Sequence, residues 1–256
     1  MPDPDPTRPN NWSKILVIVG PTASGKTGAA IEIARQLGGE IISADSRAIY
    51  KGMDIGTAKP SAEEQGGIPH WGFDLVNPDE RFTVADFKTY AETKIQEILA
   101  RGNLPIVVGG TGLYVDALIY NYNFSEQAKK TQSDREQVEQ RFYTLGIKTD
   151  RDELRERIHT RAIQMFNNKI VQETEALARH YDFRLQSMRS NIYPIVWRMI
   201  QGETTREQAI NEFELDDWHL ARRQITWFKR NQSIVWVPRD EIVNLVSKIS
   251  RAWRQP

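Results

Sequence analysis

Residues 20–27 read GPTASGKT and match the phosphate-binding loop pattern G-x-x-x-x-G-K-[ST] at every position. The apolar run ILVIV comes directly before this segment and the helix-forming stretch GAAIEIARQL directly after it. Glycines let backbone N–H groups curl around phosphate oxygens, and the helix presents its positive N-terminal end to the anion. The sequence therefore predicts a phosphate site made of Gly20, Pro21, Thr22, Ala23, Ser24, Gly25, Lys26 and Thr27. In it, Lys26 neutralises phosphate charge and Thr27 holds Mg²⁺.

The composition sets limits on the class of protein. The chain of 256 residues has 34 basic and 34 acidic side chains and no cysteine, which excludes disulfides, thiolate metal sites and a cysteine nucleophile. No apolar run approaches the ~20 residues of a membrane-spanning helix. We expect a soluble, cytoplasmic protein without a membrane partner, whose first 12 residues are disordered.

Short apolar runs alternate with helical patterns in the first half of the chain. The patterns predict strands at 15–19, 40–43 and 105–108 and helices at 26–37, 84–101 and 112–119, a rhythm typical of parallel βαβ units. We expect an α/β core over residues 13–120, a P-loop NTPase-like parallel sheet flanked by helices. Ligands of such sheets bind at the carboxyl ends of the strands, where the phosphate loop, Asp45 and the segment 109–111 would meet.

The second half has a different organisation. Residues 121–150 are polar, and we expect a connection there that contains a helix at about 134–143. Residues 151–256 show helical spacing of apolar residues and predict a C-terminal helical portion, with helices within 151–180 and at 187–201, 205–230 and 240–254. The apolar run at 234–237 predicts a late strand that returns to the core.

Several motifs together carry a family resemblance. They are DSRAIYKGMDIGTAKP at 45–60, GGTGLY at 109–114, the pairs PH at 69–70 and DF at 86–87, and RQITW at 223–227. With the phosphate loop, they resemble the tRNA dimethylallyltransferase (tRNA isopentenyl transferase) family. The resemblance implies transfer of a dimethylallyl group from its diphosphate to N6 of the adenosine on the 3′ side of the anticodon. It also implies tRNA and dimethylallyl diphosphate as partners and Mg²⁺ as cofactor; we expect a monomer.

The resemblance assigns catalytic roles to three residues. Asp45 would be the general base that accepts the proton of the adenine amine, and Lys26 and Thr111 would act beside it. From the residue types alone, Asp45 and Thr111 could instead be helix N-caps, because short polar side chains are preferred at that position.

Further contacts follow from the same resemblance. The tRNA would touch Asp45, Ser46, Arg47, Ala48, Thr111 and Arg135. Arg222 and Arg223 would contribute charge to the diphosphate, although from spacing alone they also fit a solvated helix face. The four histidines are scattered and show no metal-ligand spacing.

The chain departs from the family pattern in three places. The helical insertion expected after the GGT segment is reduced to about 30 residues. Ile192-Tyr193-Pro194 stands where a Gly-Tyr-Lys/Arg element is expected, and Asp217-Trp218 stands in place of a Thr-Arg pair whose arginine belongs at the diphosphate. Arg222 is a candidate to replace that charge.

Because of these departures, the sequence is compatible with three functions. The first is a compact tRNA dimethylallyltransferase, the second an adenylate dimethylallyltransferase acting on free adenine nucleotides. The third is a phosphate-loop paralogue that binds diphosphate without turnover. A nucleoside kinase would share only the phosphate loop.

Overall fold

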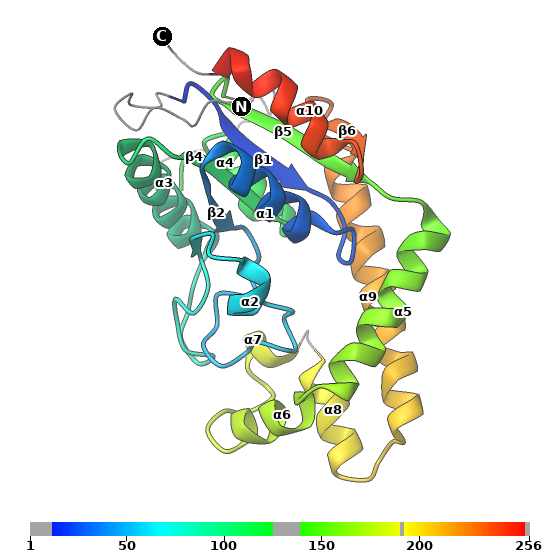
Figure 1. Cartoon of the computed structure of the whole chain (residues 1–256). Coiled ribbons are helices and arrows are strands. Elements are labelled where there is room, and N and C mark those ends of the chain that lie inside the picture. Colours follow the sequence, from blue (N-terminus) through cyan, green and yellow to red (C-terminus); the bar gives the residue numbers. More distant parts are fainter. Residues whose placement is uncertain (1–11, 125–138, 190–191, 254–256) are drawn as a thin grey trace.

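The computed structural model describes residues 12–124, 139–189 and 192–253 (Figure 1). Its centre is a six-stranded sheet in which all neighbouring strands are parallel, in the order β3-β2-β4-β1-β5-β6. The strands are β1 (Ile15–Val19), β2 (Gly39–Ser43), β3 (His70–Trp71), β4 (Leu104–Gly109), β5 (Phe142–Lys148) and β6 (Val235–Pro238). This is the predicted P-loop NTPase-like architecture, with β1 between β4 and β5.

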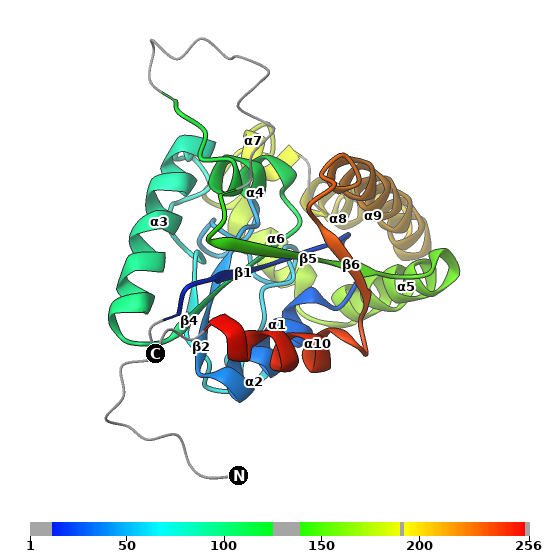
Figure 2. The same ribbon diagram turned by 90° about the horizontal axis from the view of Figure 1, so that it is seen from above.

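Helices cover both faces of the sheet (Figure 2). One face packs against α1 (Lys26–Leu37), α10 (Ile242–Ile249) and the short 3₁₀ helix η2 (Ser250–Trp253), and the other against α3 (Val84–Ala100) and α4 (Gly112–Ile119). Leu16 and Ile18 of β1 enter the first core, whereas Ile15, Val17 and Val19 enter the second. Burial on both faces explains why β1 is a continuous apolar run.

The C-terminal helical portion extends from one end of the sheet (Figure 1). Its long helices α5 (Arg151–Asn167) and α9 (Arg206–Phe228) lie side by side, and α6 (Ile170–Ala178), α7 (Gln186–Arg189) and α8 (Tyr193–Ile200) pack at their far end. This end has its own apolar core, which includes Met165, Phe166 and Phe213 and also takes in Met53 from the loop after β2. The helical portion therefore contacts the loop that carries the predicted general base.

Most predicted elements are confirmed within a residue or two, including the late strand, which is β6. The predicted helix at 187–201 is divided into α7 and α8, and the structure adds the short helix α2 (Ala62–Gln65) and β3. Trp12, expected in the disordered start, is buried in the core beside α10; the rest of that segment lies outside the described residues.

The predicted helix at 134–143 is wrong in its described part. Residues 142–148 form β5, which pairs with β1 from Ile15↔Phe142 to Val19↔Gly146 and places Leu145 and Ile147 in the core. The seven residues of β5 directly follow a long polar segment, and this polar context hides the apolar pattern of the strand. Residues 134–138 lie outside the described part of the chain.

Within the described ranges, no helix is both long and apolar enough to cross a membrane.

Candidate active site

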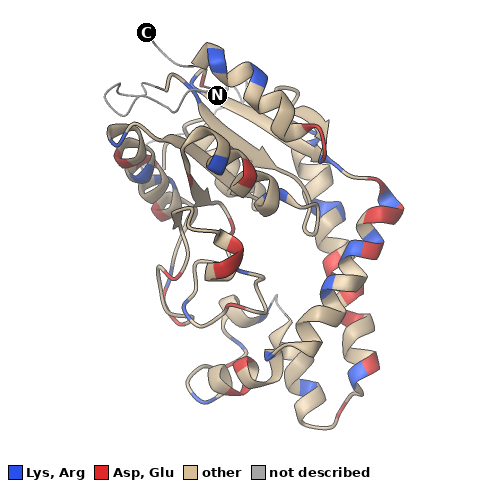
Figure 3. Ribbon diagram, viewed as in Figure 1, with Lys and Arg blue, Asp and Glu red and all other residues tan. Residues whose placement is uncertain are grey.

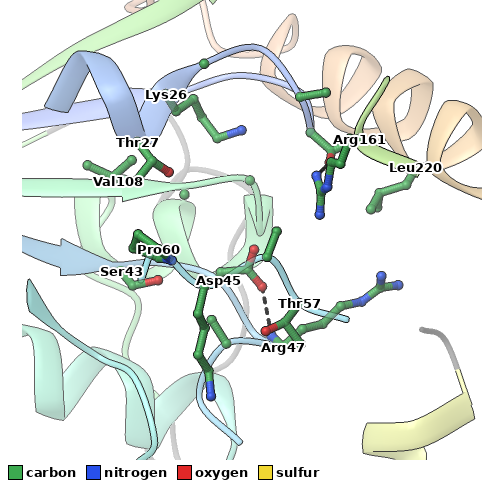
Figure 4. A pocket seen from close by; sticks show the side chains of 18 of the residues that line it. Lys26, Thr27, Ser43, Asp45, Arg47, Thr57, Pro60, Val108, Arg161 and Leu220 are labelled. Atoms are coloured by element: carbon green, nitrogen blue, oxygen red, sulfur yellow. Dashed lines mark hydrogen bonds between the residues drawn. The ribbon is translucent and has the colours of Figure 1, made fainter. Parts of the chain in front are cut away.

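A cavity of about 370 Å³ opens at the carboxyl ends of β1, β2 and β4, where α5 and α9 close its other side (Figure 4). The sheet side is formed by the phosphate loop, the loop after β2 and Gly109-Gly110; the helix side is formed by α5 and α9. Its lining includes Thr22, Lys26, Thr27, Ser43, Asp45, Arg47, Ala48, Lys59, His70, Gly110, Arg157, Arg161, Asp217, Leu220 and Gln224. The site thus lies where parallel α/β sheets bind ligands.

The phosphate loop runs from the end of β1 to the start of α1. Ala23 (φ 58°) and Gly25 (φ 83°) adopt left-handed conformations that turn the chain tightly before Lys26. The Lys26 ammonium donates a hydrogen bond to the carbonyl of Pro21 at 2.5 Å. Burial of the ammonium lowers the pKa of Lys26 to about 8, although Asp45 acts in the opposite direction. The cation is therefore poorly solvated until an anion enters.

Asp45 lines the cavity opposite this loop (Figure 4). Its Oδ1 accepts a hydrogen bond from the Arg47 backbone N–H at 2.8 Å, which stabilises a turn, and no helix begins here. The helix N-cap alternative is therefore excluded. Within the described part of the chain Oδ2 has no hydrogen-bond partner, so this oxygen is available to a ligand.

Arg47 follows in the same turn and is partly buried. Desolvation lowers the pKa of its guanidinium, whereas Asp45 and Asp217 oppose this effect and Arg161 and Arg223 add to it. Ala48 also lines the cavity, but Ser46 does not. The segment 45–48 thus places three of its four residues at the cavity and leaves out Ser46.

Thr111 holds the Asp45 turn in place through Ser46. Its hydroxyl accepts a hydrogen bond from the Ser46 backbone N–H at 3.0 Å and donates one to Ser46 Oγ at 3.2 Å. Thr111 occupies the N-cap position of α4, yet its side chain makes no cap hydrogen bond, and it does not line the cavity. The geometry makes Thr111 a tether between β4 and the Asp45 turn.

Two motifs that are far apart in the sequence meet at the edge of the cavity. Gln224 of α9 accepts a hydrogen bond from the Thr22 backbone N–H at 2.7 Å and donates one to the Gly110 carbonyl at 3.1 Å. A methyl group on Gly110 would lie 2.3 Å from the Gln224 amide, and one on Gly112 would lie 2.2 Å from the Trp227 ring. The glycines of GGTG leave the space that Gln224 and Trp227 of RQITW occupy.

The arginines at the cavity differ from those expected. Arg222 and Arg223 are exposed and do not line it, whereas Arg157 and Arg161 of α5 do. Figure 3 shows basic and acidic residues mixed along α5, so the composition of this helix gave no signal for an anion site. Arg157 and Arg161 are four residues apart and therefore lie on the same side of α5, next to the buried Leu154 and Ile158. This spacing was the one sequence signal that both arginines face the cavity.

Asp217, which takes the place of the expected threonine of the Thr-Arg pair, is 4% exposed and also lines the cavity. Trp218 lies next to Arg155, whose guanidinium carbon is 4.6 Å from the ring centroid, and next to Arg151. Arg135 lies outside the described residues.

Two family models match the chain. The model for IPP transferase matches residues 48–142 and 123–231, and the model for isopentenyl transferase matches residues 13–70. The chain belongs to the IPP transferase family. This family assignment accounts for the conjunction of a phosphate loop with the GGTG and RQITW motifs, which the cavity brings together.

Individual members of the family are similar over most of their length. A tRNA dimethylallyltransferase of Acetivibrio thermocellus is 38% identical, and the match covers 89% of this chain and 92% of that protein. A tRNA dimethylallyltransferase of Staphylococcus haemolyticus is 34% identical over 92% of both chains. The crystal structure of a tRNA isopentenylpyrophosphate transferase from Bacillus halodurans superposes with a TM-score of 0.83 at 30% identity and covers 94% of this chain and 97% of that chain.

The residues of this family member fit a magnesium ion bound together with a substrate diphosphate. The Thr27 and Ser43 hydroxyls and Asp45 line the same cavity, and Mg²⁺ is commonly held by few protein oxygens plus phosphates and water. Among the described residues no three His, Cys, Asp or Glu side chains form a metal-ligating group. The donor set therefore suits a metal that arrives with the diphosphate.

Proposed function

We propose that this IPP transferase-family chain transfers a dimethylallyl group from dimethylallyl diphosphate to the exocyclic N6 of an adenine in tRNA, at the adenosine on the 3′ side of the anticodon. The observation that carries the proposal is the pairing of Asp45 with the phosphate loop across one cavity: an available carboxylate oxygen faces a buried lysine. This substitution needs a proton acceptor and an anion site that face each other across the bound substrates.

In the proposed reaction, the N6 amine attacks C1 of the dimethylallyl group, the C1–O bond breaks and diphosphate leaves. The proton released from N6 passes to Asp45 Oδ2. General-base assistance of this kind contributes ~10²- to 10⁴-fold. Lys26 and the loop N–H groups stabilise the charge that develops on the leaving oxygen, and such fixed donors act mainly on the transition state.

Mg²⁺ would be held by Thr27 and would neutralise charge on the leaving diphosphate. The chain's own residues do the remaining work: Lys26 binds the diphosphate, Asp45 moves the proton, and Thr111 orients the Asp45 turn through Ser46.

The acceptor base must leave its stack to reach Asp45, because an N6 amine inside a folded loop is not accessible. Arg47 and Ala48 line the cavity beside Asp45 and are the residues that would contact the extruded nucleotide. The reduced insertion motivates the alternative acceptor, a free adenine nucleotide.

Mass spectrometry of nucleosides tests the proposal. Purified protein is incubated with dimethylallyl diphosphate and Mg²⁺, with unmodified tRNA in one reaction and AMP in another, beside the Asp45→Asn variant. We expect isopentenyladenosine in tRNA with the wild type only. Product from AMP alone would change the acceptor class, and diphosphate binding without either product would indicate a paralogue that has lost turnover. A monomeric state and a cytoplasmic location remain predictions for gel filtration and cell fractionation.

A further inference from the structure

Three side chains meet where the phosphate loop touches the two long helices. The Thr22 hydroxyl donates to Asp217 Oδ2 at 3.3 Å and accepts a hydrogen bond from Arg161 Nη1. Arg161 Nη1 also lies 3.7 Å from Asp217 Oδ2. The contact joins α5 and α9 to the loop that would bind the diphosphate.

A buried carboxylate at this place needs an electrostatic explanation. Asp217 lines the same cavity as the phosphate loop, and an unpaired carboxylate beside a diphosphate would repel it. Arg161 removes that conflict because its guanidinium neutralises Asp217 and still faces the cavity, with its side chain 24% exposed (Figure 4). Asp217 in turn holds the guanidinium against the loop by charge attraction at 3.7 Å and through the Thr22 hydroxyl, which both side chains contact.

The other charged side chains of the cavity leave Arg161 as one of the few cations available to an anion. Two of the cations that line the cavity are already neutralised: Lys59 pairs with Asp54 and Asp74, and Arg157 pairs with Glu153. These three carboxylates do not belong to the described lining of the cavity. The remaining charges are the cations Lys26, Arg47 and Arg161 against the carboxylates Asp45 and Asp217, and their excess of one positive charge suits an anion.

We infer that Arg161 is a diphosphate-binding residue of this chain and that Asp217 is the positioning residue that orients it. Arg161 supplies, from α5, the charge expected from α9 at the position that Trp218 occupies. Arg222 does not replace that charge, because it is exposed and lies outside the cavity lining. The inference rests on the proposed function of the same cavity, and it names how the diphosphate is held there.

Calorimetric titration with inorganic diphosphate and Mg²⁺ tests the inference without any tRNA. The variants are Arg161→Met, Arg161→Lys and Asp217→Asn, and the matched control is Arg155→Met, an exposed arginine of the same helix that does not line the cavity. Loss of one charge-assisted contact predicts a Kd about 10- to 100-fold higher for Arg161→Met. Arg161→Lys should be intermediate, and Arg155→Met should stay within about twofold of the wild type.

The positioning role of Asp217 has its own readout. Asp217→Asn should weaken diphosphate binding in the wild-type background, because the Arg161 guanidinium loses the residue that positions it. In the Arg161→Met background it should instead strengthen binding, because the carboxylate it removes is unpaired there and repels the diphosphate. Equal effects in both backgrounds would overturn the positioning role. Circular dichroism confirms that each variant is folded, and Arg161→Lys, which keeps the charge and the aliphatic stem, serves if Arg161→Met does not fold.

The outcomes separate this inference from the proposed function. An Arg161→Met protein that binds diphosphate within twofold of the wild type overturns the inference even if the wild type prenylates tRNA. Conversely, loss of binding in Arg161→Met in a protein that prenylates nothing would support the diphosphate role and refute the proposed transfer.

Discussion

The two walls of the cavity differ in how their chemistry is built. The sheet wall consists of backbone turns at strand ends, where Lys26, Thr27 and Asp45 follow within eight residues of the end of β1 or β2. The helix wall consists of side chains from α5 and α9, which are separated along the chain and meet only when these helices pack. A contiguous motif specifies the first wall, whereas a packing geometry specifies the second. The binding site of the leaving diphosphate therefore depends on both walls.

The largest expected effect tests the sheet wall. Asp45→Asn keeps an oxygen for the Arg47 turn but removes the basic carboxylate, so the rate of prenyl transfer should fall by ~10²- to 10⁴-fold. Diphosphate binding should not weaken, since a negative charge is removed from the cavity. An assay with radiolabelled dimethylallyl diphosphate measures the rate of prenyl transfer, and calorimetry measures the affinity for diphosphate. Asp79→Asn, an exposed carboxylate outside the cavity, is the control; a rate within tenfold of wild type for Asp45→Asn would contradict the base role.

The second prediction concerns a substitution that disturbs the packing of the GGTG segment against α9. Gly112→Ala places a methyl group 2.2 Å from the Trp227 ring, which a hydrogen bond to Asp116 at 2.9 Å holds in place. Overpacking of this kind should lower the free energy of unfolding by ~1–3 kcal/mol, measured by urea denaturation. Trp227→Ala in the same chain should remove most of this added cost. If the two changes are additive, the clash is not the cause.

The third prediction concerns Lys26, whose pKa burial lowers to about 8. The lysine is protonated below that pH and neutral above it, and bound diphosphate favours the protonated form. Affinity for diphosphate should therefore be nearly constant below pH 8 and fall up to about tenfold per pH unit above it. Calorimetry from pH 7 to 9.5 measures this, and Lys26→Met should remove the slope. A slope retained in Lys26→Met would assign the titration to another group.

The smallest effect tests how the helical portion holds the loop after β2. Glu173 accepts backbone hydrogen bonds from Asp54, Ile55 and Gly56 at 2.8–3.2 Å and one from the Tyr193 hydroxyl at 2.8 Å. Tyr193→Phe removes one of these donors and should cost ~1 kcal/mol of unfolding free energy.

Chemical denaturation measures this cost, with Tyr181→Phe as the control, because the Tyr181 hydroxyl has no partner among the residues that the structure describes. An equal loss of unfolding free energy in both variants would show that the hydrogen bond from Tyr193 to Glu173 does not stabilise the fold.

Sequence patterns predicted most of the sheet and helices because β1, β2 and β4 are buried runs bounded by turn residues. They missed β5, whose neighbour in the sequence is polar although its neighbour in space is β1. Of the site, Lys26, Thr27 and Asp45 were placed by their own motifs. Arg157, Arg161 and the role of Gln224 were not, since an arginine on a charged helix has no local feature that indicates which way the helix will face.

The sequence alone determined the phosphate loop, because its glycines and the helix start act through backbone geometry within eight residues. It also determined the family, because the motifs of the loop, GGTG and RQITW occur together. Only the tertiary structure decided which cations reach the loop. Packing of α9 against α5 turns Asp217 and Arg161 toward Thr22 and leaves Arg222 in solvent, and this choice depends on contacts between residues more than 50 positions apart.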